Sequence, residues 1–116
     1  MQDIRHIIEN GENVTTEFKT SFGNEVIETL VAFANAKGGK VLIGVSNDKE
    51  VKGISIKAET IQNWINEIKQ KTAPTLIPDV EIVDLNQKKV AIFRIQEYPL
   101  KPLAFKGRYY KRISNS

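Results

Sequence analysis

The chain contains no cysteine, one histidine and no long hydrophobic run, and each absence excludes a class of function. Without cysteine there are no disulfides, no thiolate metal sites and no cysteine nucleophile. His6 alone cannot build a histidine-rich zinc site, and it argues against a serine–histidine–aspartate triad. No apolar run approaches the roughly 18 residues of a membrane span. The first residues also lack a hydrophobic signal segment, so we expect a cytoplasmic protein without membrane contact.

The remaining composition is that of one soluble domain. The chain has 116 residues, of which 41% are hydrophobic and 27% are charged. This length suffices for one modest core but not for separate substrate and cofactor domains. We therefore expect residues 1–116 to form a single domain.

The spacing of apolar residues predicts the secondary structure. Helical periodicity is found over residues 2–9, 24–37 and 57–71. Alternation or aliphatic runs predict strands over residues 14–20, 41–45, 80–85, 89–95, 103–105 and 108–113, with a short return strand over 51–54. These elements predict an α+β domain, with a mixed sheet of about five strands covered by two main helices.

Positive charge is concentrated at the C-terminal end. Residues 1–97 contain 12 Lys and Arg against 14 Asp and Glu, a balance of −2. Residues 98–116 contain five Lys and Arg and no acid, a balance of +5. Such asymmetry is typical of a protein that binds a polyanion. The alternative is an exposed tail whose charge only improves solubility.

The basic segment also contains aromatic residues in the pattern of a nucleic-acid contact. Its cations and tyrosines are Lys106, Arg108, Tyr109, Tyr110, Lys111 and Arg112. On a strand, cations can neutralise phosphates while an aromatic ring stacks on an unpaired base, each stack contributing about 1–3 kcal/mol. The alternative places Tyr109 or Tyr110 in the core and leaves the cations solvated.

The glycines do not form a nucleotide-binding loop. Gly39 and Gly44 have the four-residue gap of a P-loop, but Val45 and Ser46 follow instead of Lys and Ser or Thr. The residues between these glycines are predicted to be a strand. Gly38 and Gly39 are therefore interpreted as a helix end and a tight entry to that strand.

Carboxylates near a lysine provide a second candidate site. Glu17 and Lys19 share one strand face, Glu12 lies just before that strand, and Asp48 follows the next strand. Carboxylate oxygens can hold Mg²⁺ or Mn²⁺ for phosphodiester cleavage, and a lysine can assist the attacking water. The alternative is an ordinary surface salt bridge.

Asn35 is a polar residue on the apolar stripe of the second predicted helix. Burying an amide without partners is costly, so we expect its side chain to bond the backbone near Gly38 and Gly39. A role facing a ligand is the alternative.

In sequence order these motifs resemble the AlbA-like domain of the Schlafen family and its microbial relatives. The resemblance rests on Glu12, on the motif Thr16-Glu17-Phe18-Lys19, on the run from Ala32 to Val45, on Lys52-Gly53-Ile54 and on Tyr109-Tyr110-Lys111-Arg112-Ile113. It covers essentially the whole chain. It implies a nucleic-acid-binding α+β domain that forms the N-terminal part of longer proteins, which are predicted transcriptional regulators.

Some members of the family cleave RNA with two glutamates, one aspartate and a divalent metal. The resemblance assigns the glutamates to Glu12 and Glu17. In those nucleases acidic residues follow the strand directly, whereas Ser46 and Asn47 precede Asp48 here.

Three functions are therefore predicted in order of preference. The first is a module that binds DNA or RNA, with phosphate contacts from Lys19 and the basic strand. The second is a metal-dependent ribonuclease that uses Glu12, Glu17 and Asp48, with assistance from Lys19. The third is a protein-interaction domain, for which pairing of edge strands into a homodimer is one route.

Overall fold

Most of the predicted elements are present in a computed structural model that describes residues 3–105 and 108–109. Its helices are α1 (Ile4–Asn10), α2 (Asn24–Ala34) and α3 (Thr60–Lys71). Its strands are β1 (Thr16–Lys19), β2 (Gly39–Ile43), β3 (Thr72–Ala73), β4 (Asp79–Leu85), β5 (Lys88–Ile95), β6 (Ala104–Phe105) and β7 (Arg108–Tyr109). The α+β class is confirmed.

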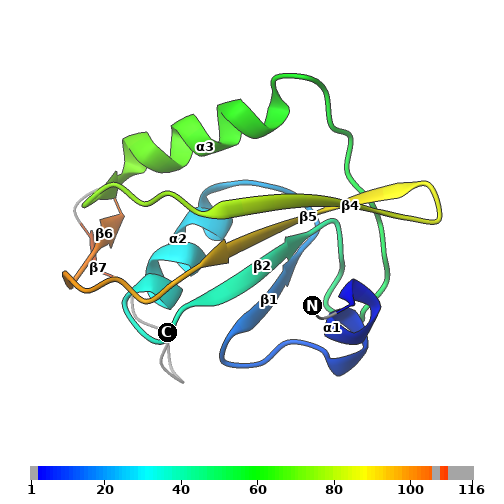
Figure 1. Ribbon diagram of the computed structural model, residues 1–116, viewed down its shortest axis with the longest axis horizontal. Helices are drawn as coiled ribbons and strands as arrows, with labels where there is room; N and C mark the ends of the chain where they lie inside the picture. The colour runs from blue at the N-terminus through cyan, green and yellow to red at the C-terminus, as the bar shows by residue number, and fades with distance from the viewer. Residues whose placement is uncertain (1–2, 106–107, 110–116) are drawn as a thin grey trace.

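The strands form two sheets. The larger has the order β1-β2-β5-β4, in which β1 and β2 are parallel and the other neighbours are antiparallel. The predicted mixed sheet is thus confirmed, although it contains four strands. The other three form a small antiparallel sheet, β3-β6-β7, beside α2 (Figure 1).

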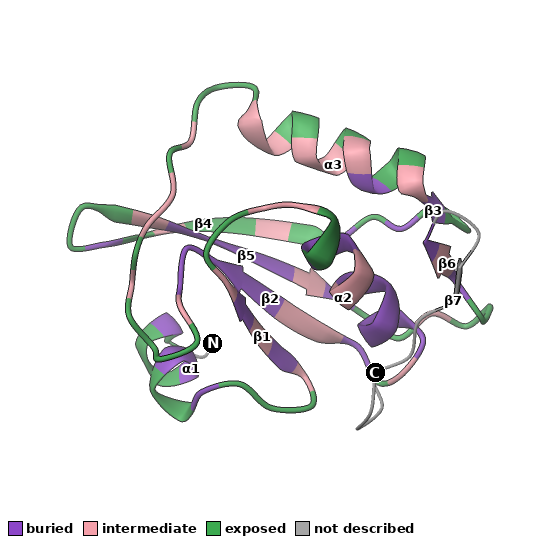
Figure 2. Ribbon diagram, turned by 180° about the vertical axis from the view of Figure 1, so that it is seen from behind, coloured by how far each residue is buried: buried purple, intermediate pink, exposed green. Residues whose placement is uncertain are grey.

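Helices cover both faces of the larger sheet. Alternation along β2 directs Val41 and Ile43 to one face and Leu42 to the other. The first face packs against α2 and α3, and the second against α1 (Figures 1 and 2). The last three residues of β2, Val41, Leu42 and Ile43, are fully buried, which is the reason for their aliphatic character.

An aromatic cluster attaches α3 to the larger sheet. The ring of Trp64 stacks on Phe22 with centroids 4.9 Å apart, and it lies 6.0 Å from the ring of Phe93. Trp64 is thus partly buried and packs against the core on this face of the sheet. In the described part of the chain no helix has the length and apolar character needed to cross a bilayer.

Two predicted strands are shorter than expected. β1 begins at Thr16, and Val14 lies outside it with 72% of its surface exposed. The Asn13 side chain accepts the Thr15 N–H at 2.9 Å, and this turn delays the strand. The return strand predicted over 51–54 is reduced to two isolated bridges, Val45 with Val51 and Ile54 with Lys89.

Candidate nucleic-acid interface

The basic segment enters the small sheet at its edge. β7 pairs with β6 on one side and is the last strand in the order β3-β6-β7. Phe105 of β6 is buried in the core beside α2, which fixes the start of the segment. Arg108 and Tyr109 form β7. The predicted contacts Lys106, Tyr110, Lys111 and Arg112 lie outside the described residues.

Asn35 holds this segment to the end of α2. Its amide donates to the Leu103 carbonyl at 3.1 Å, and its carbonyl accepts the Leu103 N–H at 2.7 Å. The expected backbone hydrogen bonds are present, but their partner is Leu103 rather than the turn at Gly38 and Gly39. The sequence indicated that Asn35 needed a partner, but nothing in it pointed to a residue 68 positions away.

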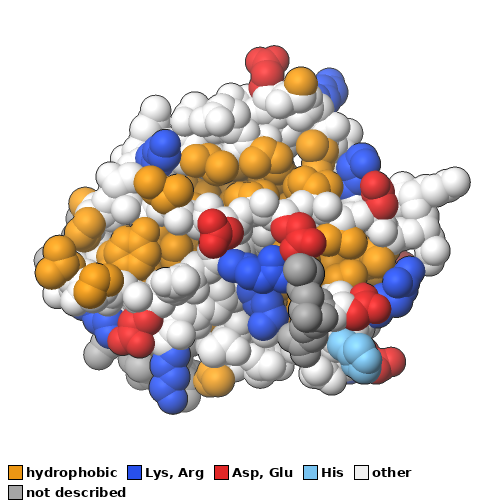
Figure 3. Space-filling model, viewed as in Figure 1, with side chains coloured by type: hydrophobic (Ala, Val, Ile, Leu, Met, Phe, Trp, Pro, Cys, Tyr) orange, Lys and Arg blue, Asp and Glu red, His pale blue; other side chains and the backbone are white. Residues whose placement is uncertain are grey.

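Within the described part of the chain, some of the cations are paired with carboxylates. Six ion pairs are present there: Lys19–Glu25, Lys52–Glu50, Lys71–Glu67, Lys89–Asp84, Arg94–Glu81 and Lys101–Glu97. On the face in Figure 3, Lys and Arg side chains lie beside Asp and Glu side chains. Lys101, which belongs to the basic C-terminal segment, is one of the paired cations.

Lys19 is one of the paired cations. Its Nζ lies 3.1 Å from the Glu25 carboxylate, at the start of α2, and 26% of its side-chain surface is exposed. It belongs to β1 in the larger sheet, whereas Arg108 belongs to the small sheet. The two predicted phosphate contacts are therefore carried by different sheets.

The glutamates occupy different positions around β1. The Lys19 carbonyl accepts a hydrogen bond from the Gly44 N–H, so the N–H and C=O groups of Lys19 point toward β2. Because these groups alternate in direction along a strand, those of Phe18 point toward the outer edge of the sheet. There the Glu12 Oε2 accepts the Phe18 N–H at 3.0 Å. Glu17 is half-buried and pairs in register with Val41, on the α2 side of the sheet. Glu12 thus caps an edge N–H of β1.

Asp48 lies in an exposed turn beyond the end of β2. The Ser46 hydroxyl donates to its carboxylate, and this hydrogen bond lowers the pKa of Asp48 below its ordinary value of 3.8. Because the folded pKa is the lower one, ionised Asp48 stabilises the turn at neutral pH. That contribution is lost as the pH falls through the lowered pKa.

The three carboxylates do not fit a divalent-metal site as they are arranged here. Within residues 3–105 and 108–109, no group of three His, Cys, Asp or Glu side chains is placed to hold a metal ion. The Glu12 carboxylate bonds the Phe18 N–H, and Asp48 bonds Ser46. No catalytic step through Mg²⁺ or Mn²⁺ is therefore derived, and the ribonuclease remains a prediction from sequence.

Two solved structures resemble this fold. The DIP2311 protein from Corynebacterium diphtheriae matches with a TM-score of 0.75 and 14% identity over 97% of this chain. This chain spans only 25% of that protein. The second is the N-terminal domain of a Nitrosomonas europaea protein described as related to the ATP-dependent DNA helicase RecG. Its TM-score is 0.73 at 21% identity, over 100% of this chain and 92% of that one.

The comparison with sequence families gives the assignment. No curated protein matches the chain. The family model described as Schlafen, AlbA_2 matches residues 12–116, which includes the Thr16–Lys19 motif, the glycine-flanked strand β2 and the basic segment. With this match over nearly the whole chain, the chain belongs to the Schlafen, AlbA_2 family.

Proposed function

We propose that this chain is a nucleic-acid-binding domain whose basic C-terminal strand contacts the phosphate backbone. The observation that carries the proposal is the +5 balance of residues 98–116, which continues from β6 into the edge strand β7. An edge strand has one side free of neighbouring strands, so a groove of nucleic acid can approach it. Family membership supports the same role.

The preferred ligand is duplex DNA, and the preferred context is the N-terminal part of a longer regulatory protein. One fold relative is the N-terminal domain of a protein named for a DNA helicase. Lys106, Arg108, Lys111 and Arg112 would bind phosphates, with Lys19 as a further contact. Tyr109 or Tyr110 would stack on an unpaired base where the ligand offers one.

The test is the salt dependence of binding to labelled duplex DNA, measured by fluorescence anisotropy. If about five phosphates are neutralised, log affinity against log salt has a slope of about −4.5. Removing two contacts with Arg108→Gln and Arg112→Gln reduces the slope to about −2.7. The matched control is Lys57→Gln with Lys69→Gln, which removes the same charge from exposed positions and leaves the slope unchanged.

Three outcomes would overturn the proposal. A flat salt response, or equal effects of the two double variants, would show that the basic strand makes no specific phosphate contact. The third outcome comes from a cleavage assay, in which the protein is incubated with tRNA or single-stranded RNA in the presence of Mn²⁺ or EDTA. Metal-dependent fragments that disappear in Glu17→Gln would assign the ribonuclease function instead.

A further inference from the structure

The larger sheet has one protected edge and one open edge. It ends at β1 on one side and at β4 on the other. At the β1 edge the strand has four residues, and the outward N–H of Phe18 is bonded by the Glu12 carboxylate at 3.0 Å. β4 has seven residues and runs along the other edge (Figure 1). It is therefore the edge on which a further strand can pair.

The hairpin turn determines which backbone groups of β4 point outward. β4 pairs with β5 residue by residue and without a bulge, and both residues of the connecting loop, Asn86 and Gln87, have positive φ. In a two-residue hairpin the pair that closes the loop is hydrogen-bonded, and bonded pairs then alternate along the strands. The N–H and C=O groups that point away from β5 are therefore those of Val80, Ile82 and Asp84.

These outward groups lack partners, and the edge lacks the usual protection. Among residues 3–105 and 108–109, no hydrogen bond from outside the sheet reaches the backbone of Val80, Ile82 or Asp84. Protein edges are commonly protected by proline, bulges or charge. β4 contains neither proline nor a bulge, and two of its three carboxylates are paired with cations of the neighbouring strand β5.

α3 adds an apolar surface beside this edge. Ile61 and Ile65 are only half-buried, although Ile68 on the same helix is fully buried. They lie on a different side of the helix from Lys71, which bonds Asn24 of α2 at 2.7 Å. In Figure 3 apolar side chains form a band between α3 and β4. A strand added to β4 would cover this band.

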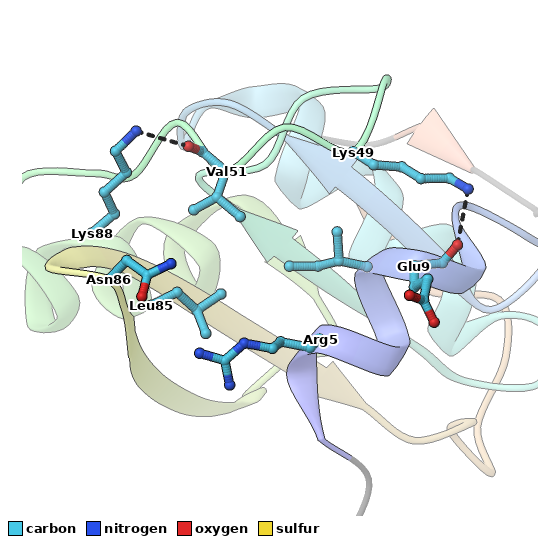
Figure 4. A pocket seen from close by; sticks show the side chains of 8 residues that line it. Arg5, Glu9, Lys49, Val51, Leu85, Asn86 and Lys88 are labelled. Carbon is cyan, nitrogen blue, oxygen red and sulfur yellow. Dashed lines mark hydrogen bonds between the residues drawn. The ribbon is translucent and has the colours of Figure 1, made fainter.

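The loop end of β4 is held against the rest of the molecule. It lies beside a groove of about 510 Å³ that Arg5, Lys49 and Lys88 line (Figure 4). The side chain of Leu85 is buried there, and Lys88 Nζ donates to the Val51 carbonyl at 3.3 Å. Because these contacts fix the end of the hairpin, little conformational entropy is lost when a second strand pairs with β4.

The sequence of β4 is complementary to a second copy of itself. About a two-fold axis through Ile82, each Ile82 lies opposite Ile82 of the other copy, Val80 lies opposite Asp84, and Glu81 lies opposite Val83. Every outward N–H and C=O group then meets an outward group of the other strand. No two carboxylates are opposite each other, an arrangement that would be destabilising.

The neighbouring registers are less favourable. An axis through Glu81 places the two Glu81 carboxylates opposite each other and Asp84 opposite Pro78, which has no N–H. An axis through Val83 places Val80 opposite Asn86, in the hairpin loop rather than in a strand. The register centred on Ile82 is the one that uses the whole edge.

We propose that the chain forms a two-fold symmetric dimer in which β4 pairs antiparallel with β4 of a second copy. The two larger sheets join into one continuous sheet. Ile82 has 38% of its surface exposed and lies on the same face as Val80, which packs against the core beside α3. Ile61 and Ile65 of each copy therefore cover the Ile82 pair. The proposal is independent of nucleic-acid binding, because β4 and α3 contain none of the proposed phosphate contacts.

The first test is sedimentation equilibrium at protein concentrations up to roughly 1 mM. Ile82→Lys places two ammonium groups opposite each other, so we expect it to raise the dimer dissociation constant at least about tenfold. The matched controls are Ile77→Lys, which is 58% exposed and precedes β4, and Val14→Lys, which is 72% exposed and precedes β1. Both should leave the dissociation constant unchanged. Circular dichroism establishes that each variant is folded.

The second test is disulfide cross-linking, which reports the register because the chain has no cysteine of its own. Opposed residues of antiparallel strands are close enough for a disulfide. We expect Ile82→Cys to form a covalent dimer on mild oxidation, and Glu81→Cys to cross-link with Val83→Cys more readily than with itself. Ile77→Cys is the control that should stay monomeric on a denaturing gel.

The dimer proposal is wrong if the unaltered protein is a monomer over the whole concentration range. It is also wrong if Ile82→Lys dissociates the dimer no more than Ile77→Lys does, or if Ile77→Cys cross-links as fast as Ile82→Cys. A dimer disrupted by Val14→Lys instead would place the interface at β1. A monomer that still binds DNA with the expected salt dependence would overturn this proposal and leave the proposed function intact.

Discussion

Asn35 is the residue on which the connection between α2 and the basic segment depends. It is 4% exposed, and its amide is satisfied by both backbone groups of one residue, Leu103. Leu103 is itself fully buried, so its N–H and C=O have no access to solvent as a substitute. The side chain therefore supplies polar partners that helix and sheet do not provide at this point.

Replacing this amide should be costly. We expect Asn35→Ala to lower the free energy of unfolding by about 2–4 kcal/mol, because two buried polar groups lose their partner. Urea unfolding measures this change. The control is Asn63→Ala on the exposed side of α3, which should leave the midpoint unchanged or raise it slightly. An Asn35→Ala midpoint equal to that of the unaltered protein would contradict the assigned role.

At the scale of elements, the close passage between α2 and β2 depends on Gly39. A Cβ at this position would lie 2.7 Å from the ring of Phe33, a contact that cannot be accommodated without movement. Phe33 is fully buried at the end of α2, so its ring has little room to shift. The absence of a side chain allows β2 to begin directly beneath the helix.

Gly39→Ala should therefore lower the free energy of unfolding by about 1–3 kcal/mol, as expected for overpacking. If the Phe33 ring is the cause, the same change should cost less in a Phe33→Leu background. Thermal or urea unfolding of the four variants gives the coupling energy between the two positions. An identical cost in both backgrounds would show that the contact with Phe33 is not responsible.

At the scale of the whole molecule, one sheet joins two cores. The core beside α2 and α3 contains Phe93, against which Trp64 packs, and the core beneath α1 contains Phe18 and Leu42. Successive residues of β2 face these cores alternately. Loss of packing in one core therefore disturbs the strand on which the other depends.

This arrangement predicts cooperative unfolding. Leu42→Ala, beneath α1, should destabilise the protein by about 2–5 kcal/mol. Trp64 is the only tryptophan and packs against the other core, so its fluorescence reports on the packing of that core. We expect the fluorescence transition and the circular-dichroism transition to shift together. If the circular-dichroism midpoint falls while the fluorescence midpoint does not change, the two cores unfold independently.

Much of the fold could be predicted from sequence, because periodicity is a local property. The apolar spacing of Val26, Ile27 and Leu30 predicts α2, and the aliphatic run of β2 predicts a strand covered on both faces. The strand predicted over residues 51–54 is not formed, because a strand requires a neighbouring strand in register as well as suitable residues. The division of the strands into two sheets likewise depends on pairing rather than on composition.

The candidate sites, like the fold, depend partly on local sequence and partly on tertiary contacts. The sequence by itself determined the family motif, the +5 balance of residues 98–116 and the type of most elements. Only the tertiary structure decided that Asn35 bonds Leu103, that Glu12 caps β1 and that Arg5, Lys49 and Lys88 line one groove. The physical reason is that charge and periodicity are properties of neighbouring residues, whereas these contacts join segments whose separation is set by register and packing.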